Sequence, residues 1–322
     1  MFLFFHNTPP HAHPLRRSCD GASYSGSVEL PVPYNATVNL HFRGAANLRS
    51  ALQHAMARFS IVSPPEVAVI GGSAGGLSTT LHVDKIGAML GAGSIVGVPE
   101  CGWFPFWDAP CTGPTNKNSK MCNATGDFLG VVAMQNATGA LSPECRAAQG
   151  GEEWRCFMAQ VATPYVRAPL FVWQSKFDHF QLTDFLSVDC AFEQAYTPPW
   201  KPAPLCSQNN TKAIVEYGAY FMGTLKDLLA APGPHRALYL TSCVLHGMDW
   251  NYLTLGDNAA GELGTTPSVA FNAWYRAVVL GVDKAPSVGN DWKWVEDLQE
   301  PRVDNPLACP PFAFTPPTPP RK

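Results

Sequence analysis

The sequence predicts an α/β fold in which a mostly parallel central sheet is flanked by helices. Short apolar segments recur along the chain and alternate with stretches whose apolar residues follow helical spacing. A turn rich in glycine or polar residues follows the main apolar segments, as at the carboxyl ends of strands in open sheets. Because a strand–helix–strand unit places its two strands parallel, these observations indicate a sheet built from such units.

The segment around Ser73 is the centre of this prediction. Val67–Ile70 reads as a strand, a glycine-rich turn follows it, and a helix then runs to about Leu90. The turn contains Gly71-Gly72-Ser73-Ala74-Gly75, a G-x-S-x-G pattern that typically holds its serine in a strained conformation above the strand end. The helix start also points free N–H groups toward a developing oxyanion, and the amide of Ala74 is the natural first donor.

A glycine-rich phosphate loop is the alternative interpretation of this turn. The sequence lacks the G-x-x-x-x-G-K-[ST] pattern, and G-x-G-x-x-G does not occur at this position. We therefore expect Ser73 to be a nucleophile.

Upstream of the serine turn we expect one helix. Residues 1–17 carry histidines among prolines and are expected to be disordered, or to be the remainder of a truncated N-terminal segment, in which case the first strands of the sheet can be missing. Apolar residues recur at helical spacing from roughly Ala45 to Phe59, which predicts an amphipathic helix. Pro64-Pro65 ends that helix and starts the strand that enters the serine turn.

Downstream of the serine turn the alternation continues. The apolar segments at 94–99, 169–174 and 237–241 predict three further strands. Helical spacing predicts helices over about 213–229 and 270–280. The strands and helices therefore continue the unit that the serine turn begins.

Residues 105–160 interrupt this alternation. They are loop-rich, with four cysteines and two glycosylation sequons, and predict a cap-like insertion stapled by disulfides. With this insertion we expect residues 18–310 to form a single domain, followed by a proline-rich tail at 311–322.

Composition narrows the class of protein. The net charge of −3 gives no electrostatic reason to expect nucleic acid or an anionic membrane as partner. No apolar run approaches the roughly 18–20 residues of a membrane span. No C-x-x-C pair or Cys/His cluster indicates zinc, and we expect neither a metal nor an organic cofactor.

Cysteines and sequons point to the secretory pathway. The ten cysteines are an even set, and the spacings Cys111…Cys122 and Cys145…Cys156 suggest short disulfide loops. Four N-x-[ST] sequons stand at Asn35, Asn123, Asn136 and Asn209. The apolar run that opens the chain is far too short for a signal peptide, so we expect a secreted or cell-wall protein whose signal peptide is missing upstream.

Acyl transfer by a serine needs a base within hydrogen-bond reach and an acid that fixes the tautomer of that base. The order serine, acid, histidine, with each residue just past a strand, occurs once in this chain with clear strand context. Ser73 follows VAVI, Asp178 follows PLFVWQ and His246 follows ALYLT. We expect Ser73 as nucleophile, His246 as general base and then acid, and Asp178 as orienting carboxylate.

Each partner of the serine has alternatives. The other histidines that we considered are His82, His179 and His235. The other carboxylates are Asp184, Asp189 and Asp249. None of them combines a strand end with the expected order as the chosen pair does.

Further segments match motifs that occur together in one protein family. They are Cys19–Gly26 (CDGASYSG), Phe42–Gly44 (FRG), Gly72–Leu77 with His82–Asp84, Gly102–Phe104 (GWF), Gly151–Phe157 (GEEWRCF), Phe177–Gln181 and Ser242–His246. From about Cys19 to Cys309 the chain thereby resembles the pectin acetylesterase family, which includes the animal carboxylesterase Notum.

The resemblance implies an α/β-hydrolase fold and a serine carboxylesterase with Ser73, Asp178 and His246 as its triad. It implies secreted hydrolysis of the O-acetyl esters of cell-wall pectin. The alternatives are a Notum-like removal of a palmitoleoyl group from a protein, and a truncated, weakly active or inactive homologue that binds a glycan. We expect Trp103, Phe104 and Gln181 to bind substrate, and the protein to be a monomer.

The chain departs from the family in two places. Members carry, upstream of the CDG-like segment, a glycine-rich strand end that finishes in Gly-Trp and completes the oxyanion hole, and nothing before Cys19 matches it. Ala74 then remains as the evident donor, and losing one donor costs on the order of 10²–10³ in rate. His246-Gly247-Met248 also replaces the HCQ of the plant enzymes.

Overall fold

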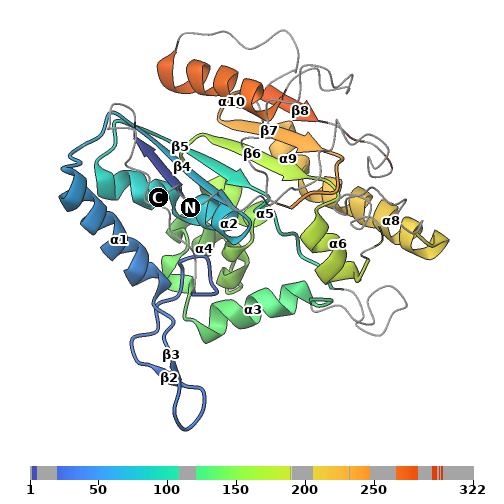
Figure 1. The fold of residues 1–322 in the computed structure, drawn as a ribbon, viewed down its shortest axis with the longest axis horizontal. Coiled ribbons are helices and arrows are strands. Elements are labelled where there is room, and N and C mark those ends of the chain that lie inside the picture. The colour runs from blue at the N-terminus through green and yellow to red at the C-terminus, as the bar shows by residue number, and fades with distance from the viewer. Residues whose placement is uncertain are drawn as a thin grey trace, which may run out of the picture.

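The computed structural model describes residues 2–5, 20–108, 121–188, 190, 206–231, 233–246, 266–281, 292–295, 297 and 299. Within these residues one six-stranded sheet has the order β1-β4-β5-β6-β7-β8, and its last five strands are parallel (Figure 1). Those five strands are β4 (Glu66–Gly72), β5 (Ser94–Glu100), β6 (Leu170–Ser175), β7 (Arg236–Thr241) and β8 (Lys293–Val295). The predicted mostly parallel sheet is therefore confirmed.

The first strand corrects the expectation for residues 1–17. Phe2–Phe5 form β1, which pairs antiparallel with β4 from Phe2 opposite Ile70 to Phe5 opposite Val67. The expected disorder is wrong for these four residues, because their backbone completes the hydrogen bonding of the outer edge of β4. Residues 6–19 lie outside the described residues.

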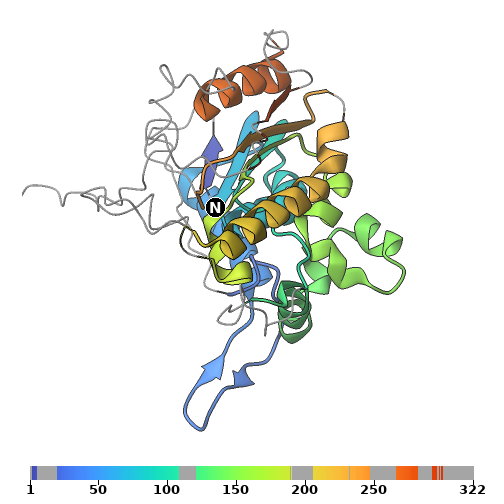
Figure 2. The same cartoon turned by 90° about the vertical axis from the view of Figure 1, so that its right-hand side faces the viewer.

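Helices cover both faces of the sheet, so the molecule has three layers. Figures 1 and 2 show α10 (Pro267–Tyr275), with the π-helical turn Arg276–Leu280, on one face, where it is the only helix among the described residues. The opposite face carries α1 (Gly44–Phe59), α2 (Ala74–Leu90), α3 (Ala124–Met134), α4 (Pro143–Ala148), α5 (Ala159–Ala162), α6 (His179–Leu186), α8 (Gln208–Thr224) and α9 (Lys226–Ala230). Among the described residues, no helix is long and apolar enough to cross a membrane.

Alternation along the strands divides the core between the two faces. Val67 and Val69 of β4 pack into the cluster under α1 and α2, whereas Ala68 and Ile70 pack into the cluster under α10. The strands of a sheet that is covered on both sides must be apolar at successive positions. This explains why they read as continuous apolar runs in the sequence.

The insertion at 105–160 is more helical than we predicted. Its residues 109–120 lie outside the described residues, but the described remainder contains α3, α4 and the 3-10 turns Thr138–Ala140 and Glu153–Phe157. Side chains cap the two helices: Asn123 accepts from Gly126 N, and Ser142 accepts from Cys145 N. The loop-rich description is therefore wrong for this part, because N-capping residues start short helices there.

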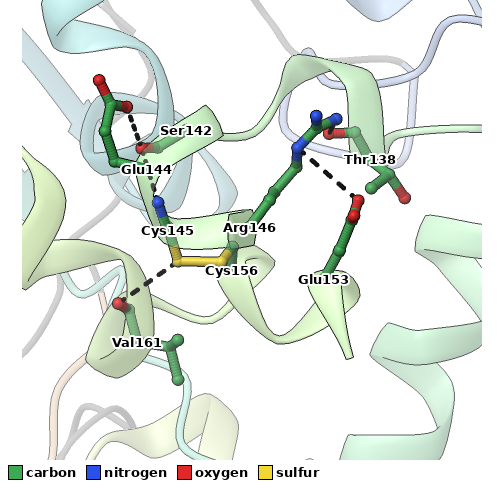
Figure 3. The surroundings of a disulfide bond; sticks show 8 residues. All are labelled: Thr138, Ser142, Glu144, Cys145, Arg146, Glu153, Cys156 and Val161. Atoms are coloured by element: carbon green, nitrogen blue, oxygen red, sulfur yellow. Dashed lines mark hydrogen bonds and ion pairs between the residues drawn. A yellow bond between two sulfur atoms is a disulfide. The ribbon is translucent and has the colours of Figure 1, made fainter. Parts of the chain in front are cut away.

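Disulfides fasten this layer, as predicted. Cys145 and Cys156 are bonded, with their Cα atoms 6.0 Å apart, and Figure 3 shows the bond joining α4 to the 3-10 turn that contains Cys156. Beside it, Arg146 Nε lies 3.7 Å from Glu153 Oε2 (Figure 3). A second bond joins Cys190 to Cys206, and both Cys122 and Cys243 are also disulfide-bonded.

Smaller corrections concern helix ends. The predicted helix 213–229 is α8 followed by α9, and α8 begins earlier because Ser207 accepts a hydrogen bond from Asn210 N at 3.2 Å.

A hairpin of β2 (Val32–Pro33) and β3 (Asn39–Leu40) stands apart from the main sheet. The proposed tail at 311–322 lies outside the described residues.

Replacing both Cys145 and Cys156 by alanine will lower the free energy of unfolding by about 2–3 kcal/mol, because the bond restricts a short loop in the unfolded chain. Urea denaturation of the oxidised parent and of the double variant measures the difference. Because the parent treated with a reductant loses the same constraint, it should move toward the variant. An unchanged unfolding midpoint in the double variant would contradict the stapling role.

Candidate functional site

The turn between β4 and α2 places Ser73 at the carboxyl end of the sheet. Ser73 has φ 57° and ψ −124°, in the positive-φ region that side chains rarely adopt. Ser73 N donates to the carbonyl oxygen of Glu100 at 2.9 Å, and Gly76 N donates back to Ser73 O at 2.8 Å. These backbone bonds hold the strained serine in place from both the neighbouring strand and the helix.

Close backbone packing explains the glycines around the serine. A Cβ built on Gly71 would lie 2.2 Å from Gly75 O, and one on Gly102 would lie 2.4 Å from both Gly76 C and Leu77 N. No real Cβ tolerates such distances, so the first turn of α2 rests directly on the chain that leaves β5. The glycine pattern seen in the sequence is thus a requirement of this contact.

Asp178 and His246 reach Ser73 from the ends of two other strands. His246 Nε2 lies 2.7 Å from Ser73 Oγ, and His246 Nδ1 lies 2.9 Å from both carboxylate oxygens of Asp178. Asp178 is fully buried at the N-cap of α6, where Oδ1 also accepts from Gln181 N at 3.1 Å. The structure thus brings the three predicted side chains into one hydrogen-bonded chain.

The alternative histidines lie in other surroundings. His82 Nε2 lies 3.2 Å from Ser25 Oγ and 2.9 Å from Ser23 O, and burial lowers its pKa to about 4. Burial also lowers the pKa of His179 to about 4, and the backbone N of His179 donates to Leu245 O. His235 precedes β7, at the opposite end of that strand from Ser73.

Of the three alternative carboxylates, the structure describes one. Asp184 lies within α6 and acts on His246 through its charge. Asp189 and Asp249 lie outside the described residues.

Several charges act on His246. Burial lowers its pKa, but the charge of Asp178, the hydrogen bond to Asp178 and the charges of Glu100 and Asp184 outweigh this, so that the pKa lies above its usual value. The neighbouring His179 is neutral near pH 7, since its own pKa is about 4. The site therefore favours the imidazolium form of His246.

Glu100 is a charged residue of the site to which the sequence pattern assigns no role. It ends β5 directly opposite Gly72 of β4, it is 5% exposed, and a Cβ built on Gly72 would lie 3.8 Å from Glu100 Oε2. Its position at the end of a predicted strand was the signal in the sequence. The carboxylate is therefore next to the serine turn as well as within the electrostatic reach of His246.

The three residues expected to bind substrate are nearly or fully buried. Trp103 donates from Nε1 to Thr224 Oγ1 at 3.0 Å and is 4% exposed. Gln181 is fully buried, donates to Trp103 O at 2.9 Å and accepts from Tyr217 OH at 2.7 Å. These bonds give Trp103 and Gln181 a part in positioning the start of α6, where Asp178 lies.

Phe104 takes a different position. Its ring centroid lies 6.4 Å from that of His246 and 5.9 Å from those of Phe128 and Phe180. Phe180, which the sequence reading missed, lies closer still, with 5.2 Å between its ring centroid and that of His246. An apolar aromatic cluster therefore packs beside the imidazole.

The backbone on either side of Ser73 is open to solvent. Gly72 and Ala74 are exposed and Ser73 is half-buried, and Ala74 is the first residue of α2. Residues 6–19, just upstream of Asp20, lie outside the described residues. In the part of the chain that the structure describes, no group of three or more His, Cys, Asp or Glu residues is placed to hold a metal ion.

A comparison of the chain with models of known protein families finds a match. The model of the pectinacetylesterases matches residues 16–287. The chain belongs to this family. The predicted family membership is therefore confirmed. The relatives are named as pectin acetylesterases and carboxylesterases, which are carboxylic ester hydrolases.

The relatives include plant pectin acetylesterases and animal NOTUM carboxylesterases. Pectin acetylesterase 7 of Arabidopsis thaliana is 29% identical over 272 residues, which cover 80% of this chain and 63% of that protein. Pectin acetylesterase 11 of the same plant is 27% identical, with 83% and 66% covered. The palmitoleoyl-protein carboxylesterase NOTUM of Drosophila melanogaster is 25% identical over 264 residues, or 79% of this chain and 34% of that protein.

A solved structure supports the fold of this family member. The Wnt deacylase Notum from Drosophila superposes with a TM-score of 0.61 at 21% identity, covering 85% of this chain and 70% of that one. The predicted α/β-hydrolase-like fold is confirmed by this likeness. The chain spans less than two thirds of the length of the two plant relatives.

Changing Glu100 to glutamine will lower the pKa of His246, because one of the negative charges that raise it is removed. For the general-base role proposed below, His246 must be neutral, so the acid limb of the kcat/KM profile for ester hydrolysis should move to lower pH. The profile of Glu100→Gln against p-nitrophenyl acetate measures this shift.

Two controls accompany this measurement. Glu100→Asp keeps the charge and should keep the midpoint near that of the parent. Asp184→Asn removes the carboxylate with the smallest of the raising contributions and should shift the midpoint less. A midpoint that stays in place in Glu100→Gln would show that Glu100 has no electrostatic role in the site.

Proposed function

We propose that this chain is a serine carboxylesterase that hydrolyses the O-acetyl esters of cell-wall pectin. The observation that carries the proposal is the hydrogen-bonded chain from Ser73 through His246 to Asp178. Membership of the pectinacetylesterase family and the relation to plant pectin acetylesterases support the substrate class.

In the proposed mechanism, Ser73 Oγ attacks the carbonyl carbon of the ester while His246 Nε2 takes its proton. Asp178 holds the imidazole in the tautomer that carries its proton on Nδ1, and its charge stabilises the imidazolium. The negative charge on the carbonyl oxygen is stabilised by the N–H of Ala74 at the start of α2. His246 then returns the proton to the leaving sugar hydroxyl, which departs from the acyl-enzyme.

The second half of the reaction repeats these steps with water. His246 takes a proton from a water molecule, whose oxygen attacks the acetyl carbonyl on Ser73. The bond between the acyl carbon and Ser73 Oγ breaks, and His246 returns the proton to Ser73 Oγ. Acetate leaves, and the mechanism uses no metal or organic cofactor.

The aromatic cluster beside His246 bears on the size of the acyl group. Phe104 is 5% exposed and packs against Phe128 and Phe180, so the space beside the imidazole is occupied by rings. A filled apolar wall suits a methyl group better than a long chain. This supports acetyl esters over the alternative, a Notum-like deacylase for a fatty acyl group on a protein.

We also infer the setting of the enzyme. The Cys145–Cys156 and Cys190–Cys206 disulfides form and persist in an oxidising compartment, which supports a secreted glycoprotein. In this proposal residues 18–310 make one domain with a cap at 105–160. The domain acts as a monomer on its polysaccharide.

Ser73→Ala will reduce the kcat for p-nitrophenyl acetate by on the order of 10³-fold or more, because the variant lacks the hydroxyl that attacks the ester in this mechanism. Ser50→Ala is the matched control, since Ser50 is an exposed serine on α1 and its loss should leave the rate within about twofold. Hydrolysis that survives unchanged in Ser73→Ala would refute the esterase mechanism.

The acyl preference follows from the aromatic cluster. The parent should hydrolyse p-nitrophenyl acetate with a kcat/KM at least about tenfold above that for the octanoate, since extra methylenes find no room. Phe104→Ala should narrow this ratio, whereas Phe59→Ala, on an exposed site of α1, should not. A parent that prefers octanoate would favour the deacylase alternative.

A further inference from the structure

The β2–β3 hairpin has an unusual surface. Figures 1 and 2 show it extending away from the three layers, beyond the ends of α1 and α3. Leu30 is 76% exposed, Tyr34 71%, Val38 44% and Leu40 37%. Exposed apolar side chains that follow so closely along one protruding segment mark a surface that another group covers.

The turn of the hairpin contains a glycosylation sequon, Asn35-Ala36-Thr37. Asn35 is exposed, and its Oδ1 accepts from Thr37 N at 2.9 Å, Thr37 Oγ1 at 3.1 Å and Val38 N at 2.9 Å. All three bonds use the carboxamide oxygen, whereas a glycan is attached to the nitrogen. The turn therefore presents the acceptor amide with the threonine hydroxyl already beside it.

The other sequons are built into helical structure. Asn123 caps α3, and its sequon hydroxyl, Thr125 Oγ1, accepts from Trp107 N at 2.9 Å instead of facing the asparagine. Asn209 lies in the first turn of α8. Asn136 follows α3, and Ala137, the middle residue of its sequon, is fully buried. Among the four sequons, the one at Asn35 alone lies on a protruding turn.

We propose that Asn35 carries an N-linked oligosaccharide whose first sugar packs on Tyr34 and covers the apolar hairpin. The side chain of Tyr34 directly precedes the acceptor, and its ring offers an apolar face to the apolar face of N-acetylglucosamine. The disulfides of this chain indicate the compartment in which such attachment occurs.

The attachment exchanges one bond for another. The co-reactant is an oligosaccharide linked through a diphosphate to a membrane lipid. The Nδ2 atom of Asn35 forms a bond to C1 of the first sugar, while the bond from C1 to the diphosphate oxygen breaks. The lipid diphosphate leaves, and the proton lost from the amide passes to the base of the transferase.

Occupancy is tested on the full chain secreted from a eukaryotic host. Peptide mass spectrometry after glycan removal in heavy-oxygen water, which marks each modified asparagine, should show Asn35 modified in most molecules. Asn35→Gln and Thr37→Ala should each lose that mark, while Thr37→Ser should keep it. A secreted chain in which Asn35 is unmodified in most molecules would overturn the proposal.

The packing on Tyr34 is tested by thermal unfolding before and after enzymatic removal of the glycan. Removal should lower the Tm of the parent by about 1–3 °C. This difference should shrink by at least about half in Tyr34→Thr and persist in Val62→Thr, a control 82% exposed and outside the hairpin. An equal difference in parent and Tyr34→Thr would show that the glycan does not cover the tyrosine. Hydrolysis of p-nitrophenyl acetate by the same samples reports separately on the proposed esterase.

Discussion

The contact between the first turn of α2 and the chain leaving β5 determines where the other groups of the site can lie. Gly76 and Gly102 approach so closely that neither position accepts a side chain. The bond from Ser73 N to Glu100 O joins the same two segments. Because this contact fixes the height of the serine above the sheet, the histidine and the aspartate need only extend from neighbouring parallel strands to reach it.

Two kinds of residue then complete the site. Asp178 touches His246 directly, whereas Glu100 and Asp184 act on it through space. Trp103, Gln181 and Tyr217 form a buried chain of hydrogen bonds that holds the start of α6, and with it Asp178. A buried network of this kind is favourable only when its members are all bonded, which ties the geometry of the carboxylate to residues far from it in sequence.

Much of the fold could be predicted because its strands are apolar on both faces and end in conspicuous turns. The proximity of the three candidate side chains could be predicted for the same reason, since Ser73, Asp178 and His246 all follow such strands. Strand β1 could not, because four residues carry no periodicity and their partner is distant in sequence. Gln181 was expected to face substrate, but its partners Trp103 and Tyr217 come from other segments, and their proximity is a product of the fold.

The burial of His82 has a consequence for tolerance to acid. Folding lowers the pKa of this imidazole from 6.5 to about 4, so the folded state keeps it neutral while the unfolded chain takes up a proton. Its contribution to stability is complete above pH 6.5 and declines as the pH falls toward 4. Since its hydrogen bonds join α2 to Ser23 and Ser25, acidification weakens the attachment of that N-terminal stretch to the helix that begins next to Ser73.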